Sequence, residues 1–156
     1  DFNLIYPALL GASRVVVMEG ALFYHYRYVE DSIVHCYDPH NAESVEGWYK
    51  AIRRIIHEKK VPDGEKKLDR EYCYMMMYVM KNELRNPGKD YIRKIQRIFM
   101  EPKTRKRITS TPLCVKSRSN ALLYLGMQYP NKGLLRILRM IVRQHDRVGN
   151  RHKASR

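Results

Sequence analysis

The chain has 156 residues, 44% of them hydrophobic and 29% charged, and its formal net charge at pH 7 is +14. This composition is sufficient for one folded core and excludes a largely disordered chain, and three widely spaced cysteines exclude a disulfide framework. No apolar run approaches the roughly 20 residues of a membrane-spanning helix, so we expect no transmembrane segment. The chain begins with Asp1 rather than Met, and we therefore expect it to be a piece of a longer protein.

Residues 14–37 predict three short strands. β-Branched and aromatic residues dominate the segments RVVVMEG, ALFYHYRYVED and SIVHCYD, which are separated by Gly20 and by residues 30–32. Such short separations favour hairpins, so we expect a three-stranded antiparallel β-meander. A sheet this small needs a covering layer, which the following helices would supply. The predicted fold class is therefore α+β.

Apolar residues at helical spacing predict three helices in the middle of the chain. The first covers residues 44–60, and the second runs from about Lys66 to Arg85, where Asn86-Pro87-Gly88 stops it. Within the second helix, the Met- and Tyr-rich segment 72–80 is typical of core packing. The third helix covers residues 90–100.

The remaining residues predict a long connection and two further helices. Residues 101–118 show no periodicity and contain two prolines, so we expect an exposed loop. A short helix at 119–129, the tight turn YPNKG and a longer helix from Leu134 to Gly149 would form a helix–turn–helix-like pair.

The positive charge is confined to the second half of the chain. Residues 1–88 hold 12 Lys and Arg and 13 Asp and Glu, a balance of 12 − 13 = −1, whereas residues 89–156 hold 18 and 3, a balance of 18 − 3 = +15. Such an excess indicates a polyanionic partner: nucleic acid, an anionic membrane surface or an acidic protein. We predict a near-neutral lobe at 1–88 for packing, protein contacts or self-association and a basic helical lobe at 89–156, with one continuous domain as the alternative.

Arginines recur every three or four residues along the last predicted helix. At 100° per residue they fall within an arc of about 80°, and their planar guanidinium groups suit bidentate bonds to phosphate. A basic arm follows this helix, and the loop before it holds a second basic strip, which Arg93, Lys94 and Arg97 would extend. The predicted nucleic-acid contacts are Lys103, Arg105, Lys106, Arg107, Lys116, Arg118, Lys132, Arg136, Arg139, Arg143, Arg147, Arg151 and Lys153.

The sequence gives little support to catalysis. Asp63, Glu65 and Lys67 imitate a metal-dependent nuclease signature but crowd into one turn, and Cys36 and His40 lack the second pair that a zinc site needs. We therefore expect no metal and no cofactor, and an enzyme that acts on nucleic acid stays an alternative without a convincing catalytic set.

Together these features predict a nucleic-acid-binding protein that uses mainly phosphate contacts. A DNA-binding regulator and an RNA-binding protein both fit this prediction. Its expected location is the nucleus, with the cytosol second, because free cysteines suit a reducing compartment. One alternative is a viral nucleocapsid- or matrix-type structural protein that binds genome or anionic lipid and self-associates. Another is a module that docks on acidic proteins.

Overall fold

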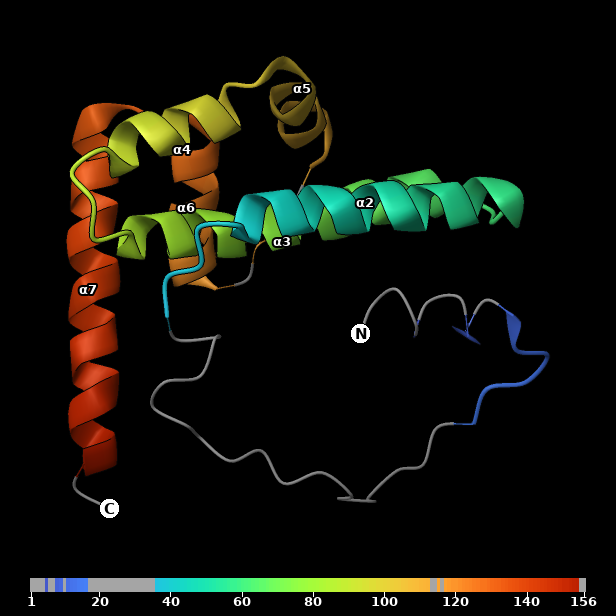
Figure 1. Cartoon of the computed structure of the whole chain (residues 1–156), viewed down its shortest axis with the longest axis horizontal. Helices are drawn as coiled ribbons and strands as arrows, with labels where there is room; N and C mark the ends of the chain where they lie inside the picture. The colour runs from blue at the N-terminus through green and yellow to red at the C-terminus, as the bar shows by residue number, and fades with distance from the viewer. Residues whose placement is uncertain are drawn as a thin grey trace.

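The computed structural model describes residues 36–112, 115 and 117–154, with residues 5, 8, 9 and 11–16 near the N-terminus, and it describes side chains up to residue 146. Within this part of the chain the helices follow one another with short connections (Figure 1). They are α2 (Asn41–Glu58), α3 (Gly64–Arg85), α4 (Tyr91–Phe99), α5 (Pro102–Ser110), α6 (Arg118–Gln128) and α7 (Lys132–Ala154).

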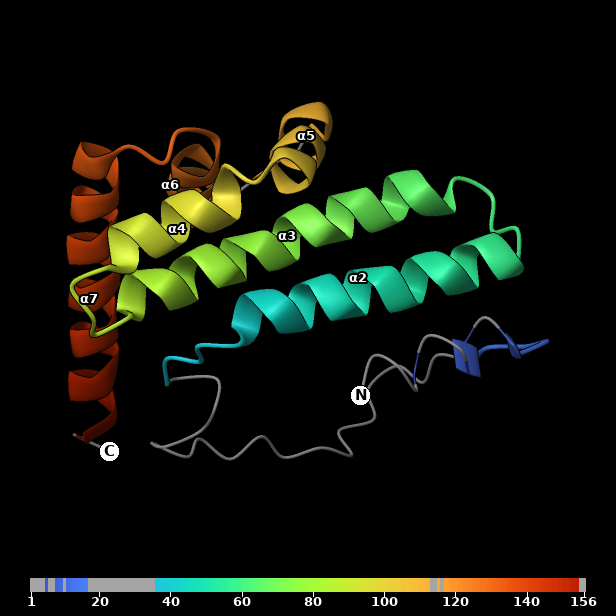
Figure 2. The same cartoon turned by 45° about the horizontal axis from the view of Figure 1, so that its top comes forward.

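Helices α2 and α3 form an antiparallel hairpin (Figure 2). The face of α2 that packs on α3 buries Trp48, Tyr49 and Ile52, the helical spacing that the sequence shows. In the turn between the helices, Lys60 and Asp63 adopt left-handed backbone angles with φ of 50° and 53°. This turn lets the chain reverse direction within a few residues.

Helix α3 is the centre of the molecule. It contacts all five other described helices, and its long series of buried side chains includes Leu68, Tyr72, Met76, Met80 and Leu84 at four-residue intervals. The Met-rich segment therefore serves core packing, as the sequence predicts. A helix buried on several faces orders the elements around it, so α3 fixes where the basic helices lie.

Helix α7 lies across the end of the α2–α3 hairpin, and α6 packs beside it (Figures 1 and 2). A Cβ atom added to Gly126 of α6 would lie 2.5 Å from Leu138 Cδ1 of α7, so any larger residue there would force the Leu138 side chain to move. At the other side of α7, Arg85 at the end of α3 donates two hydrogen bonds of 2.8 Å to the Asp146 carboxylate. These contacts hold α7 at a fixed position on α3.

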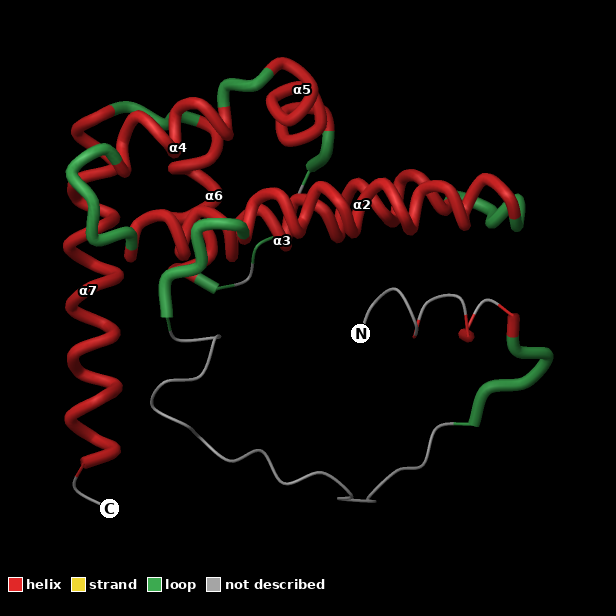
Figure 3. The backbone as a smooth tube through the Cα atoms, in the orientation of Figure 1, coloured by secondary structure: helices red, strands yellow, loops and turns green. Residues whose placement is uncertain are grey.

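The predicted α+β class is wrong for the described part of the chain. That part is 75% helical and contains no strand (Figure 3). Residues 14–16 belong to no strand, and residues 17–35, which carry most of the predicted meander, lie outside the described residues. The physical reason is that helices take the role expected of the sheet, because α2, α4, α5, α6 and α7 together cover α3.

The predicted loop at 101–118 is also wrong, because residues 102–110 form α5. The Glu101 carboxylate accepts a hydrogen bond of 2.7 Å from the Thr104 backbone N–H, and Pro102 occupies the first turn. Only Thr104 and Ile108 are buried in this helix. Two buried positions in nine residues give too weak a periodicity to detect.

The last helix is longer than its sequence suggests. The backbone of α7 continues past Gly149 to Ala154, so Arg151 and Lys153 lie on the helix rather than on a flexible arm. A single helical glycine costs only about 1 kcal/mol, and no proline follows it.

The predicted boundary between the two lobes, Pro87-Gly88, falls in the connection between α3 and α4. Helices from both sides of it pack against each other, and the division into lobes stays a prediction.

Candidate nucleic-acid interface

Arg107 of α5 points into the protein. Its guanidinium carbon lies 4.0 Å from the centre of the Tyr49 ring and 5.0 Å from that of Tyr72, and its Nη1 lies 3.5 Å from Glu46 Oε2. Burial and the hydrogen bond to Asp69 raise the pKa of Tyr49 to about 12, so the ring stays neutral beneath the cation. Arg107 therefore joins α5 to α2 and α3 and is not available to a phosphate.

Arg107 keeps its positive charge although its side chain is half-buried. Burial alone lowers the pKa of this guanidinium, but the oxygens of Tyr49, Glu46 and Tyr72 outweigh that effect and raise it above its ordinary value. The same cluster includes a hydrogen bond that the Tyr72 hydroxyl donates to Glu46. A charged group in this setting acts as a structural connection.

Arg105 also contacts the protein rather than solvent. Its Nη1 donates hydrogen bonds to the backbone oxygens of Met127 and Gln128, the last two residues of α6. A cation at this place satisfies carbonyls that a helix end leaves without intrahelical partners. Of the basic run on α5, only Lys103 and Lys106 are exposed.

Arg139, in the middle of the predicted stripe on α7, is the third arginine that packs internally. Its guanidinium carbon lies 3.8 Å from the centre of the Tyr91 ring, and its Nη2 donates a hydrogen bond of 2.6 Å to the Asn86 backbone oxygen. These contacts connect α7 to the start of α4 and to the connection that precedes it. Lys94 of α4 is similarly engaged, because it contacts Glu83 at 3.2 Å and donates to the Tyr37 hydroxyl at 2.8 Å.

The other described cations of α7 face solvent beside α4. Two adjoining hollows of about 450 and 520 Å³ lie between the two helices and share Lys89 and Arg136. We call the pair the α4–α7 cleft. The cations that line it are Lys89, Arg93, Lys132, Arg136, Arg139 and Arg143.

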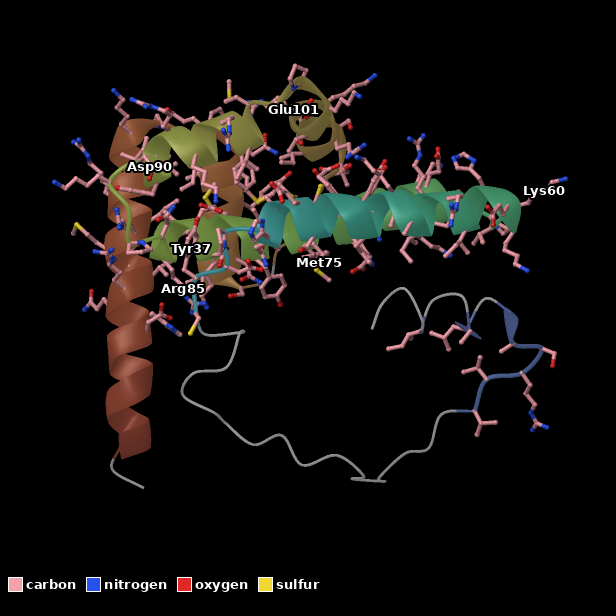
Figure 4. The ribbon with its side chains drawn as sticks, viewed as in Figure 1. Tyr37, Lys60, Met75, Arg85, Asp90 and Glu101 are labelled. Carbon is pink, nitrogen blue, oxygen red and sulfur yellow. The ribbon has the colours of Figure 1, made fainter. Side chains whose placement is uncertain are left out.

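The α4–α7 cleft is strongly positive. Its six cations face a single carboxylate, Asp90, which gives a local balance of 6 − 1 = +5. Asp90 lies beside α7, at the end of the molecule opposite Lys60 (Figure 4). Five of the six cations are exposed, and the sixth, Arg139, forms part of the wall with its guanidinium packed on Tyr91. Cations gathered in a concave surface focus the positive electrostatic field there and so attract anions.

A second basic hollow lies between α2, α4 and α5, with a volume of about 610 Å³. Three carboxylates line it beside five cations, and two of those cations are already paired, Arg53 with Glu65 and Arg107 with Glu46. Lys50, Arg97 and Lys103 remain exposed. This hollow is closer to neutrality than the α4–α7 cleft and is the weaker anion site.

A third hollow, of about 410 Å³, is mainly apolar and lies between α3, α6 and α7. Tyr78, Leu122 and Ile141 line it and are partly or largely exposed. It shares no exposed arginine with the cleft, so α7 presents cations along one edge and apolar side chains along another.

The structure places the predicted contacts in three groups. Lys103, Lys106, Arg118, Lys132, Arg136 and Arg143 are exposed, whereas Arg105, Arg107 and Arg139 pack against the protein. Lys116 and the side chains of Arg147, Arg151 and Lys153 lie outside the described residues. Sequence reasoning missed Lys89, which the Pro87-Gly88 turn brings to the start of α4.

The nuclease-like residues form no site. Glu65 accepts from Arg53 at 3.0 Å and contacts His57 at 2.9 Å, and Asp63 contacts Lys66 at 3.5 Å. Across the described ranges, no three His, Cys, Asp or Glu side chains gather in a way that could hold a metal ion. None of the helices in these ranges combines the length and apolar character that crossing a membrane needs.

Comparison with protein-family models, curated protein sequences and solved structures found no match to this chain. The α4–α7 cleft, with its five exposed cations, is therefore the candidate functional site.

Proposed function

We propose that this protein binds nucleic acid through the α4–α7 cleft, mainly by contacts between phosphates and exposed cations. The observation that carries the proposal is a cleft that gathers five exposed cations and the packed Arg139 against one carboxylate. These residues belong to α4, α7 and the connection before α4, and α3 contacts both helices. Arg136 and Arg143 are one pair of exposed guanidiniums on the same edge of α7 and suit bidentate phosphate contacts.

Binding would depend strongly on salt, because each phosphate contact releases counterions. The test is a fluorescence anisotropy titration of labelled duplex and single-stranded oligonucleotides between about 50 mM and 200 mM salt. For the variant Arg136→Gln/Arg143→Gln, the log–log salt slope should fall in magnitude by about 1.8 on duplex and about 1.4 on single strands.

A matched control removes the same charge elsewhere. Lys60 lies at the far end of the α2–α3 hairpin, away from α7 (Figure 4). Lys67 lies near the start of α3, and both lysines are exposed. The variant Lys60→Gln/Lys67→Gln should keep the wild-type slope. Equal losses in the two double variants would show that only net charge matters, which would contradict a binding site at the cleft.

The alternative, a self-associating structural protein of nucleocapsid or matrix type, gains support from the apolar hollow between α3, α6 and α7. Sedimentation velocity on wild type and on Ile141→Glu would detect pairing of two copies through this surface. Binding to anionic lipid vesicles and to an acidic polypeptide should be measured beside binding to the oligonucleotides. Preference for the vesicles would favour the matrix-type protein, and preference for the polypeptide would favour a module that docks on acidic proteins. A nuclear location follows from the proposal and stays a prediction.

A further inference from the structure

Tyr129 is a large aromatic residue that the core does not use. It directly follows α6, the residue is 61% exposed, and it does not belong to the hydrophobic cluster packed around α3. Single exposed apolar residues are common on protein surfaces, so what distinguishes Tyr129 is its position relative to the charged surfaces and not its exposure.

The short connection that carries Tyr129 is held firmly on both sides. Gln96 of α4 donates a hydrogen bond of 2.9 Å to the Pro130 backbone oxygen, and Pro130 is buried. Arg105 of α5 holds the carbonyls of the two residues before Tyr129. Asn131 caps α7, since its Oδ1 accepts from the Leu134 backbone N–H at 2.9 Å. The backbone that presents the ring is therefore already in a fixed conformation.

The same connection lies at the edge of the α4–α7 cleft. Gln96 lines the cleft together with Arg93 and Lys132, and Lys132 follows Tyr129 by three residues. The connection therefore carries Tyr129 within three residues of Lys132, one of the exposed cations that line the cleft. A basic groove combined with an exposed aromatic ring is the arrangement by which proteins hold single strands, because every unpaired base offers a flat face for stacking.

We propose that Tyr129 stacks on an unpaired base of a single-stranded nucleic acid whose phosphates occupy the α4–α7 cleft. This inference rests on the proposed function and narrows its ligand from nucleic acid in general to single strands. In a duplex the bases face one another and are stacked inside the helix, so the ring would contribute little there.

Tyr78 provides a matched control. It is 67% exposed, close to the value for Tyr129, but it lies on α3 and lines the apolar hollow. The test compares wild type, Tyr129→Ala, Tyr129→Phe and Tyr78→Ala on labelled single-stranded DNA, single-stranded RNA and duplex DNA. Thermal melting by circular dichroism checks that each variant remains folded.

Tyr129→Ala should weaken binding to at least one kind of single strand by a factor between about 5 and 150, without changing duplex affinity or the salt slope. Tyr129→Phe keeps the ring and should bind as wild type does, and so should Tyr78→Ala. An equal effect of the two alanine variants, or an equal loss on duplex, would overturn stacking by Tyr129. If the Arg136→Gln/Arg143→Gln variant binds as wild type does, the proposed function itself is wrong and the stacking proposal fails with it.

Discussion

Helices α5 and α7 both carry closely spaced cations, but a larger share of these cations packs against the protein in α5 than in α7. In α5, Arg105 and Arg107 face carbonyls and tyrosine rings, and the exposed Lys103 shares a hollow with Glu101 and two other carboxylates. In α7, only Arg139 packs internally among the described arginines, and its exposed neighbours join cations of α4 in one cleft. The spacing of charges along a sequence is similar in both helices, so their partners in space decide which helix can bind an anion.

The largest expected effect belongs to the packed arginine of α5. Arg107→Gln removes a cation from two tyrosine rings and from Glu46, and it should lower the free energy of unfolding by about 2–3 kcal/mol. The neighbouring variant Lys106→Gln changes an exposed side chain and should stay within about 0.5 kcal/mol of wild type. Urea denaturation followed by circular dichroism measures both. Equal stabilities would show that the Arg107 cluster does not hold α5.

A smaller difference is expected within α7. Arg139→Gln loses the contact with the Tyr91 ring and the hydrogen bond to Asn86, so it should lower the free energy of unfolding by about 1–2 kcal/mol. Arg143→Gln should change it by less than about 0.5 kcal/mol. The same urea titration distinguishes them, and a larger loss for Arg143→Gln would reverse the assignment of the two side chains.

The contact that fixes α7 on α3 should appear in the pH dependence of stability. Burial raises the pKa of Asp146, but the hydrogen bonds and charge of Arg85 outweigh it, with weaker help from Lys81 and His145, and the pKa lies below its ordinary value of 3.8. A carboxyl with a lowered pKa stabilises the fold above that ordinary value, and the stabilisation is lost as the pH falls through the folded-state pKa.

Asp146→Asn should therefore be less stable than wild type near neutral pH, by about 1 kcal/mol, and the difference should shrink below about pH 3.8. Urea midpoints measured from neutral to acidic pH give the comparison. A difference that stays constant across that range would show that the ion pair contributes no pH-dependent stability.

Part of the fold follows from the sequence because its signals are local. The periodic apolar positions of α2, α3, α4 and α6 predict those helices, since each buries a continuous face against the core. Helix α5 has no detectable periodicity in the sequence, because it buries only Thr104 and Ile108. The packing of the other helices around α3, in place of a sheet, also has no local sequence signal.

The candidate site is less predictable for the same reason. Helical spacing predicts that Arg136 and Arg143 share one edge of α7, and both are exposed, whereas their contact with phosphate stays a prediction. The ring of Tyr91 and the carbonyl of Asn86 that engage Arg139 come from a distant part of the chain. Lys89 lines the cleft because α3, which ends just before it, packs against α7. The sequence of residues 89–156 alone does not reveal this contact.

The most direct test of the account compares two arginines one turn apart on α7. Arg136→Gln and Arg139→Gln remove the same charge from the same helix, and only Arg136 projects into solvent. Salt titrations on labelled oligonucleotides are made under conditions where both variants are folded. Arg136→Gln should reduce the magnitude of the log–log salt slope on duplex by about 0.9. The slope of Arg139→Gln should match wild type, although its stability is lower. A loss of slope for Arg139→Gln equal to that for Arg136→Gln would contradict the division between packed and phosphate-binding arginines.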